Sequence, residues 1–134
     1  MKTRIRIGDL DRAIKEEFFN LHAWFVDPEC SERDFYNKSV KLVKLDLRKL
    51  GREDLMNLKP EQVKQYMQVV KAGDRYLPAV ADGNLVDGMH RISAMRLSGK
   101  KECLALDFTG LIDTAQSGYQ IDVKVLKLSQ ELAI

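Results

Sequence analysis

The chain has 134 residues, of which 45% are hydrophobic and 31% are charged, a composition typical of one folded domain and not of a disordered chain. Lys and Arg number 22 against 20 for Asp and Glu, and this near balance argues against a large nucleic-acid-binding surface. No apolar run approaches the roughly 20 residues of a membrane helix. The charged segment 1–10 does not resemble a secretory signal, so we expect a cytoplasmic protein that does not bind a membrane.

The N-terminal part of the chain predicts a long amphipathic helix. Within residues 9–26, apolar side chains recur at spacings of three and four, which places them on one side of a helix: Leu10, Ile14, Phe18, Leu21 and Phe25. Pro28 should end this helix, because the residue before a proline avoids helical angles. Residues 29–38 show no periodicity and are predicted to be a loop.

A strand and a second helix are predicted next. Residues 40–47 alternate between apolar and polar with one slip, which predicts a strand with a β-bulge. Residues 48–58 are polar and irregular. Pro60 can occupy the first turn of a helix, and the apolar spacing that follows predicts a helix over 60–72.

The rest of the chain is predicted to alternate between short strands and one helix. The pair Asp82-Gly83 favours a tight turn that joins two strands into a hairpin. The predicted elements are a strand at 76–81, a strand at 84–86, a helix that begins after Gly88 and ends at Leu97, a strand at 102–108, a loop at 109–119 and a strand at 121–125. The sum is a single α+β domain over residues 1–134, with the strand order left open.

The cysteines and histidines do not predict a metal site or a disulfide. Cys30 and Cys103 form no Cys-x-x-Cys pair, and His22 and His90 are remote from them in sequence. Because cytoplasmic proteins keep their thiols reduced, we predict two free cysteines. The spacing of Cys and His predicts no metal site made by protein side chains.

The segment Asp87-Gly88-Met89-His90-Arg91 predicts an anion-binding site. Asp87 can cap a helix, and Gly88 allows a ligand to approach the backbone closely. The first N–H groups of a helix carry partial positive charge, so His90 and Arg91 destabilise the helix there unless an anion is present. A phosphate would accept bonds from the amides, the imidazole and the guanidinium together. The alternative is that Arg91 pairs with an acidic neighbour and His90 caps a loop.

This segment lies within an ordered set of motifs that resembles the ParB/sulfiredoxin-like superfamily. The set, which covers about residues 40–108, consists of the helix from Pro60 to Ala72, the strand Pro78-Ala79-Val80, the turn Asp82-Gly83, the loop Gly88-Met89-His90-Arg91 and the link Gly99-Lys100-Lys101. The resemblance implies a small α+β fold with a mixed sheet and packed helices. Residues 1–39 would then be an accessory N-terminal helix and loop.

The resemblance also implies a nucleotide-binding function. Members of the superfamily bind ATP or CTP, with Mg²⁺, and several hydrolyse the nucleotide or transfer a phosphoryl group. The phosphate-binding residues would be Gly88, Met89, His90 and Arg91. The free serine kinases of the superfamily use acidic residues, which here correspond to Glu53 and Asp87 as catalytic candidates. Simpler interpretations are a solvated loop residue for Glu53 and a helix cap for Asp87. Asp107, at the end of the strand predicted at 102–108, is a further carboxylate candidate.

Departures from the superfamily pattern exclude some of the functions that the resemblance implies. Sulfiredoxins carry a reactive cysteine where this chain has Met89, so we expect no sulfiredoxin chemistry. The polar helix residues through which sulfiredoxins contact ATP correspond here to Gln62, Gln65 and Val69, which argues against contacts of that kind. The alternation after Phe108 indicates a strand, so we expect no helix-turn-helix of the partition proteins.

Two other functions compete with an enzyme that acts on a nucleotide. One is a non-catalytic adaptor that keeps the fold and binds a protein partner. The other is a DNA-associated regulator or nuclease, for which a local basic stripe is the only support: Lys41, Lys44, Arg48, Lys49 and Arg52. A charge run of this kind is usually a solvated face.

Overall fold

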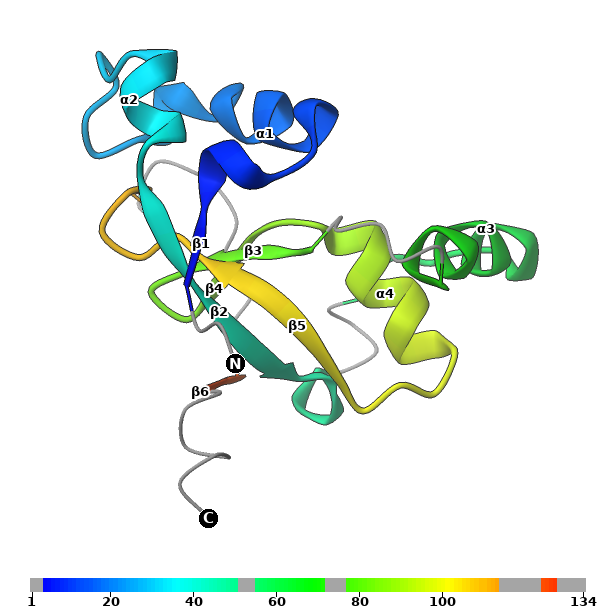
Figure 1. The fold of residues 1–134 in the computed structure, drawn as a ribbon. Coiled ribbons are helices and arrows are strands. Elements are labelled where there is room, and N and C mark those ends of the chain that lie inside the picture. The colour runs from blue at the N-terminus through cyan, green and yellow to red at the C-terminus, as the bar shows by residue number, and fades with distance from the viewer. Residues whose placement is uncertain (1–3, 51–54, 72–76, 114–123, 128–134) are drawn as a thin grey trace.

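The computed structural model describes residues 4–50, 55–71, 77–113 and 124–127, which form a mixed sheet with helices packed on it (Figure 1). In chain order the elements are β1 (Arg4–Arg6), the 3-10 helix η1 (Ile7–Asp9), α1 (Arg12–Phe19), η2 (His22–Trp24), α2 (Glu32–Tyr36), β2 (Ser39–Asp46), η3 (Leu47–Lys49), α3 (Pro60–Lys71), β3 (Ala79–Ala81), β4 (Asn84–Asp87), α4 (Met89–Leu97), β5 (Glu102–Asp107) and β6 (Lys124–Lys127). The predicted α+β class is confirmed.

The described strands form one sheet in the order β1-β2-β5-β3-β4, with β6 also paired to β2. β1 pairs with the first residues of β2 and β6 with its last four, so the two short strands lie along the same edge of β2. The pairing of β3 with β5 is parallel, whereas every other pairing is antiparallel. The parallel pair needs a crossover connection, and α4 lies within the connection from β4 to β5.

Two separate cores cover the two faces of the sheet. Alternate residues of a strand point to opposite faces. One core joins sheet residues to α1, α2 and the segment after β5, and its members include Val40, Leu106, Phe18 and Phe35. The other joins the opposite face to α4, and its members include Val43, Leu45, Val80 and Ile92. α1 and α2 therefore lie on one side of the sheet and α4, with α3 packed beside it, on the other (Figure 1).

The predicted β-bulge in residues 40–47 was wrong. The register between β2 and β5 runs without a shift from Lys41 opposite Asp107 to Asp46 opposite Glu102. The adjacent apolar residues Leu42 and Val43 belong instead to the two different cores. A strand that is covered on both faces does not need strict alternation, and this produced the apparent slip.

The single helix predicted over 9–26 was also wrong in its length. The structure has η1, then α1, which ends at Phe19, and then η2. After η2 the backbone pairs with a distant segment: the N–H of Val26 donates to the carbonyl of Leu111, and the N–H of Asp113 donates to that of Trp24. These long-range bonds replace helical ones. The predicted apolar stripe nevertheless packs in the first core, as expected.

The segment 1–39 contains two elements that were not predicted. β1 lies at the edge of the sheet, and α2 occupies part of the predicted loop 29–38. The hydroxyl of Ser31 accepts a hydrogen bond from the N–H of Asp34 at 3.1 Å, and Phe35 is buried in the first core. The pattern Ser31-x-x-Asp34 is the signal in the sequence that indicates this helix start.

The middle of the chain follows the prediction closely. α3 lies within the predicted 60–72, and α4 and β5 fall where they were expected. The turn between β3 and β4 has positive φ at Asp82 (51°) and Gly83 (78°), as a tight hairpin requires. The strand predicted at 121–125 is observed as β6, Lys124–Lys127, with residues 121–123 outside the described ones. No helix in the described part of the chain is long and apolar enough to span a bilayer.

Candidate functional site

Gly88 creates the sharp turn from β4 into α4. It is the N-cap of α4 and has a φ of +100°, a left-handed conformation that favours glycine. A Cβ on this residue would lie 2.9 Å from Cα of Pro78, so the two backbones pack too closely for any side chain. The prediction that Asp87 caps the helix was wrong: Asp87 ends β4, and its Oδ1 accepts a hydrogen bond from the N–H of Gly88 at 2.9 Å.

A cavity of about 280 Å³ lies at the start of α4. The residues that line it are Glu17, Tyr66, Asp87, Gly88, Met89, His90 and Arg91. The first bond within the helix is donated by the N–H of Ile92 to the carbonyl of Gly88. The amides before it have no acceptor inside the helix, which is the general property that lets a helix start bind an anion. The structure thus brings Asp87 and the four predicted phosphate-binding residues together around one cavity.

The side chains of this first turn have different surroundings. His90 is exposed, and its ring stacks on Tyr66 of α3 with centroids 5.4 Å apart. Arg91 is partly buried. Met89 packs against the second core, and its Sδ accepts a long hydrogen bond from Ser93 at 3.7 Å. Met89 can therefore offer a ligand its backbone amide, while His90 and Arg91 can offer side chains.

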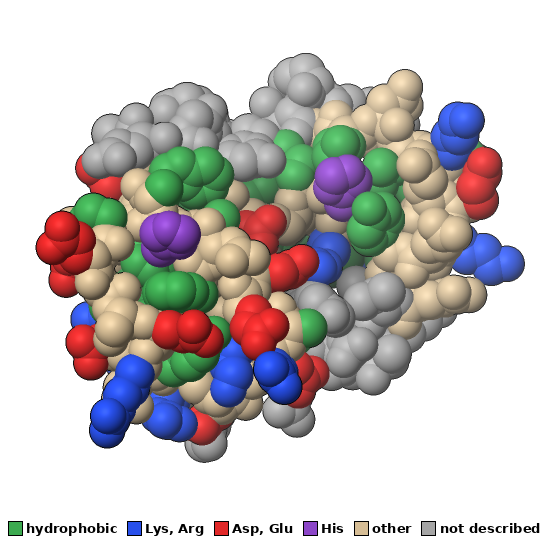
Figure 2. Space-filling view, turned by 90° about the horizontal axis from the view of Figure 1, so that it is seen from above, with side chains coloured by type: hydrophobic (Ala, Val, Ile, Leu, Met, Phe, Trp, Pro, Cys, Tyr) green, Lys and Arg blue, Asp and Glu red, His purple; other side chains and the backbone are tan. Residues whose placement is uncertain are grey.

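Two carboxylates border the same cavity. One is Asp87, as predicted, and the other is Glu17 on α1. Glu17 was missed because it precedes Phe18 of the buried stripe, and nothing in the sequence shows that α1 approaches the start of α4. In the view from above, acidic and basic side chains meet at the centre of this face (Figure 2).

The other two carboxylate candidates are Glu53 and Asp107. Glu53 lies outside the described residues. Asp107 accepts hydrogen bonds from the N–H and hydroxyl of Thr109, at 3.0 and 2.6 Å, and so closes the turn after β5. Among the described residues no group of three or more His, Cys, Asp or Glu side chains is arranged to hold a metal.

The predicted basic stripe is partly neutralised by local ion pairs. Lys44 lies 3.4 Å from the carboxylate of Glu102, and Arg48 pairs with Asp46 at 2.9 Å. The hydrogen bond from Arg48 holds the pKa of the Asp46 carboxyl below its usual value. These contacts favour the interpretation of this stripe as a solvated face, and Arg52 lies outside the described residues.

Both cysteines are free thiols. Cys103 is on β5 beside the second core, and burial raises the pKa of its thiol to about 12. A thiol with this pKa has almost no thiolate at neutral pH, so Cys103 is a poor nucleophile.

The chain matches no protein-family model, no curated protein and no solved structure. The resemblance to the ParB/sulfiredoxin-like superfamily therefore stays a prediction, and the function has to be argued from the site itself.

Proposed function

We propose that the chain is a nucleotide-binding protein that holds phosphate groups of ATP or CTP at the start of α4. The observation that supports this most directly is the cavity into which Gly88, His90 and Arg91 converge. The amides of the first turn, the imidazole and the guanidinium are all donors suited to phosphate oxygens. A ligand phosphate would also interact favourably with the partial positive charge at the start of the helix.

The size of the cavity suggests how a nucleotide would sit. A volume of about 280 Å³ is small for a complete nucleotide and suits its phosphate groups. The sugar and base would lie outside it, beside the wall formed by the stacked rings of Tyr66 and His90. This arrangement favours recognition of the phosphates over recognition of the base.

The carboxylates offer a role for Mg²⁺ in this proposal. Asp87 keeps one carboxylate oxygen beyond the bond to Gly88, and Glu17 borders the cavity from α1. Mg²⁺ usually takes one or two carboxylates and completes its shell with phosphate oxygens and water. The same two side chains are the candidates for accepting a proton if the protein hydrolyses the nucleotide or transfers a phosphoryl group.

Calorimetric titration of the full chain with ATP, CTP, GTP and pyrophosphate, each with and without Mg²⁺, tests the binding. We expect Arg91→Ala to weaken the tightest ligand about tenfold, the effect of losing one charge-assisted hydrogen bond. Lys101→Ala, which removes the same charge outside the residues that line the cavity, should leave affinity unchanged. Binding that is equal in wild type and Arg91→Ala, or absent in wild type at about 1 mM, would leave the non-catalytic adaptor as the better interpretation.

Catalysis is tested separately by release of inorganic phosphate. Asp87→Asn removes the charge and keeps an oxygen that can accept the Gly88 N–H, so the fold of the turn should survive. If Asp87 takes part in phosphoryl chemistry, this variant should bind nucleotide and release phosphate at least about a hundredfold more slowly. Unchanged release would show that Asp87 only holds the turn, and no release by wild type would show a binding protein without this activity.

A further inference from the structure

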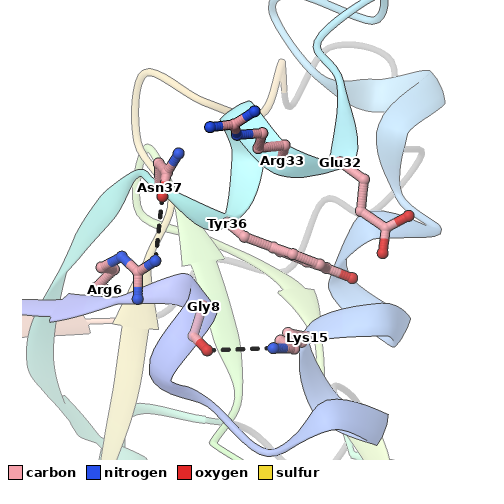
Figure 3. A pocket seen from close by; sticks show the side chains of 7 residues that line it. All are labelled: Arg6, Gly8, Lys15, Glu32, Arg33, Tyr36 and Asn37. Atoms are coloured by element: carbon pink, nitrogen blue, oxygen red, sulfur yellow. Dashed lines mark hydrogen bonds between the residues drawn. The ribbon is translucent and has the colours of Figure 1, made fainter.

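A second and larger cavity, of about 600 Å³, lies among β1, η1, α1 and α2 on the other side of α1 (Figure 3). The residues that line it are Arg6, Gly8, Lys15, Glu32, Arg33, Tyr36 and Asn37. Three of them are cations and one is a carboxylate. The cations come from three different elements, so their convergence is a product of the tertiary structure.

Two of the cations are held in place at the wall of this cavity. Arg6 donates one hydrogen bond to Asp9 at 2.8 Å and another to the side-chain oxygen of Asn37 at 3.1 Å. Lys15 donates to the carbonyl of Gly8 at 3.3 Å, and its Nζ lies 5.0 Å from the centre of the Tyr36 ring. Side chains that are already ordered lose less conformational entropy when a ligand binds.

The backbone at this place is also closely packed. A Cβ on Gly8 would lie 2.9 Å from the carbonyl oxygen of Tyr36 and 3.2 Å from Cζ of Arg6. Glycine therefore allows the turn after β1 to approach the end of α2. This approach brings Arg6 beside Asn37.

The third cation, Arg33, is exposed on α2. Its guanidinium has no ion pair or hydrogen bond with the residues that the structure describes. Figure 3 shows Arg33 and Asn37 at one end of the cavity and the carboxylate of Glu32, near the hydroxyl of Tyr36, at the other. Arg6 already forms an ion pair with Asp9 at 2.8 Å, so Arg33 supplies the uncompensated positive charge, and an anion is favoured at the end near Arg33 and Asn37.

We propose that this cavity binds a small multivalent oxyanion, a molecule with two or more phosphate or carboxylate groups. A single ion pair at a surface contributes little, so a ligand with one charge would be held weakly. A multivalent anion can engage two or three of these cations at once, and guanidinium groups match the geometry of both phosphate and carboxylate. The site shares no residue with the cavity at α4, and the proposal does not depend on the function proposed above.

The test is a titration of the ¹⁵N-labelled full chain with pyrophosphate, citrate and acetate, followed by amide chemical shifts. We expect pyrophosphate, citrate or both to shift the amides of Arg33, Tyr36 and Asn37, and acetate to shift them little. A response to pyrophosphate alone identifies a phosphate-bearing ligand, and a response to citrate alone identifies a carboxylate-bearing one. Amides of residues 89–92 report binding at α4 separately, so failure of one site is distinguishable from failure of the other.

Charge-matched variants decide whether the cavity itself is responsible. Arg33→Gln should weaken the multivalent ligand about fivefold to tenfold, as expected for one lost charge-assisted contact. Lys101→Gln, which changes the net charge equally and does not line the cavity, should change affinity by less than about twofold. Equal losses of affinity in the two variants would show that the ligand is attracted by the net charge of the protein and not by this cavity. No shift near α2 at about 10 mM ligand would overturn the proposal outright.

Discussion

The two cavities lie on either side of α1, and they are formed by different kinds of groups. Lys15 of α1 borders the larger cavity and Glu17, two residues later, borders the smaller one. The cavity at α4 combines backbone with side chains: a left-handed Gly88 and first-turn amides that have no acceptor within the helix lie beside His90 and Arg91. The cavity at α2 depends on long side chains from three elements. A change to the backbone at Gly88 should therefore disturb the first site more than the loss of one side chain does, whereas the second site should be weakened mainly by changes to its side chains.

The largest effect is expected from Gly88→Val. The new Cβ would meet the backbone of Pro78 and would require φ near +100°, so we expect a loss of about 3 kcal/mol or more in the free energy of unfolding. Chemical denaturation of the full chain measures it.

Gly99→Val is the matched control for this variant. Gly99 also has a positive φ, of 94°, but a Cβ there would meet no atom within 4 Å. Gly99→Val should lower the free energy of unfolding only by the cost of a side chain on a left-handed backbone, about 1–2 kcal/mol. Equal losses for the two variants would contradict the close packing of Gly88 on Pro78.

A smaller effect is expected from Ser31→Ala in the other region. This change removes the N-cap of α2, the helix that carries Glu32, Arg33 and Tyr36, and should lower the free energy of unfolding by about 1 kcal/mol. Amide shifts should change around α2 and not around α4. Ser31→Asp restores a capping oxygen and should recover most of the loss, and a loss that persists in Ser31→Asp would show that the cap is not the cause.

The smallest effect at neutral pH is expected from Tyr36→Phe. The Tyr36 hydroxyl is buried without a hydrogen-bond partner among the described residues, so its removal should leave the free energy of unfolding unchanged or slightly raised at pH 7. Burial, together with the nearby Glu32, raises the pKa of Tyr36 from 10 to about 12.

The raised pKa of Tyr36 affects the free energy of unfolding only at alkaline pH. Between pH 10 and 12 the unfolded chain loses the Tyr36 proton and the folded chain keeps it. The contribution to stability is therefore complete below pH 10 and is lost as the pH rises through 12. Denaturation of wild type and Tyr36→Phe across this range should show a steeper decline for wild type. Cys103, whose pKa is also raised to about 12, is present in both proteins and cancels in the comparison. Parallel declines in the two proteins would contradict the raised pKa of Tyr36 in the folded state.

Sequence reasoning succeeded where a short segment contains all the information that shapes it. The period of the segment from Pro60 predicted α3, Asp82-Gly83 predicted the hairpin, and the loop at Gly88 predicted the start of α4. In each case turn preferences, capping or helical periodicity act within a few residues. The residues of the candidate site at 87–91 were found for the same reason, since they are adjacent in the chain.

The end of α1 and the surroundings of this helix depend on long-range contacts rather than on local sequence. Its predicted continuation to residue 26 has a helical period, but backbone hydrogen bonds between residues 24–26 and the segment 111–113 take precedence over that local preference. These contacts bring together segments that are far apart in sequence. The same packing places Glu17 beside the start of α4 and Lys15 beside α2. Local sequence is thus enough to specify the first turn of α4, whereas the long-range packing of α1 sets which charges face each cavity.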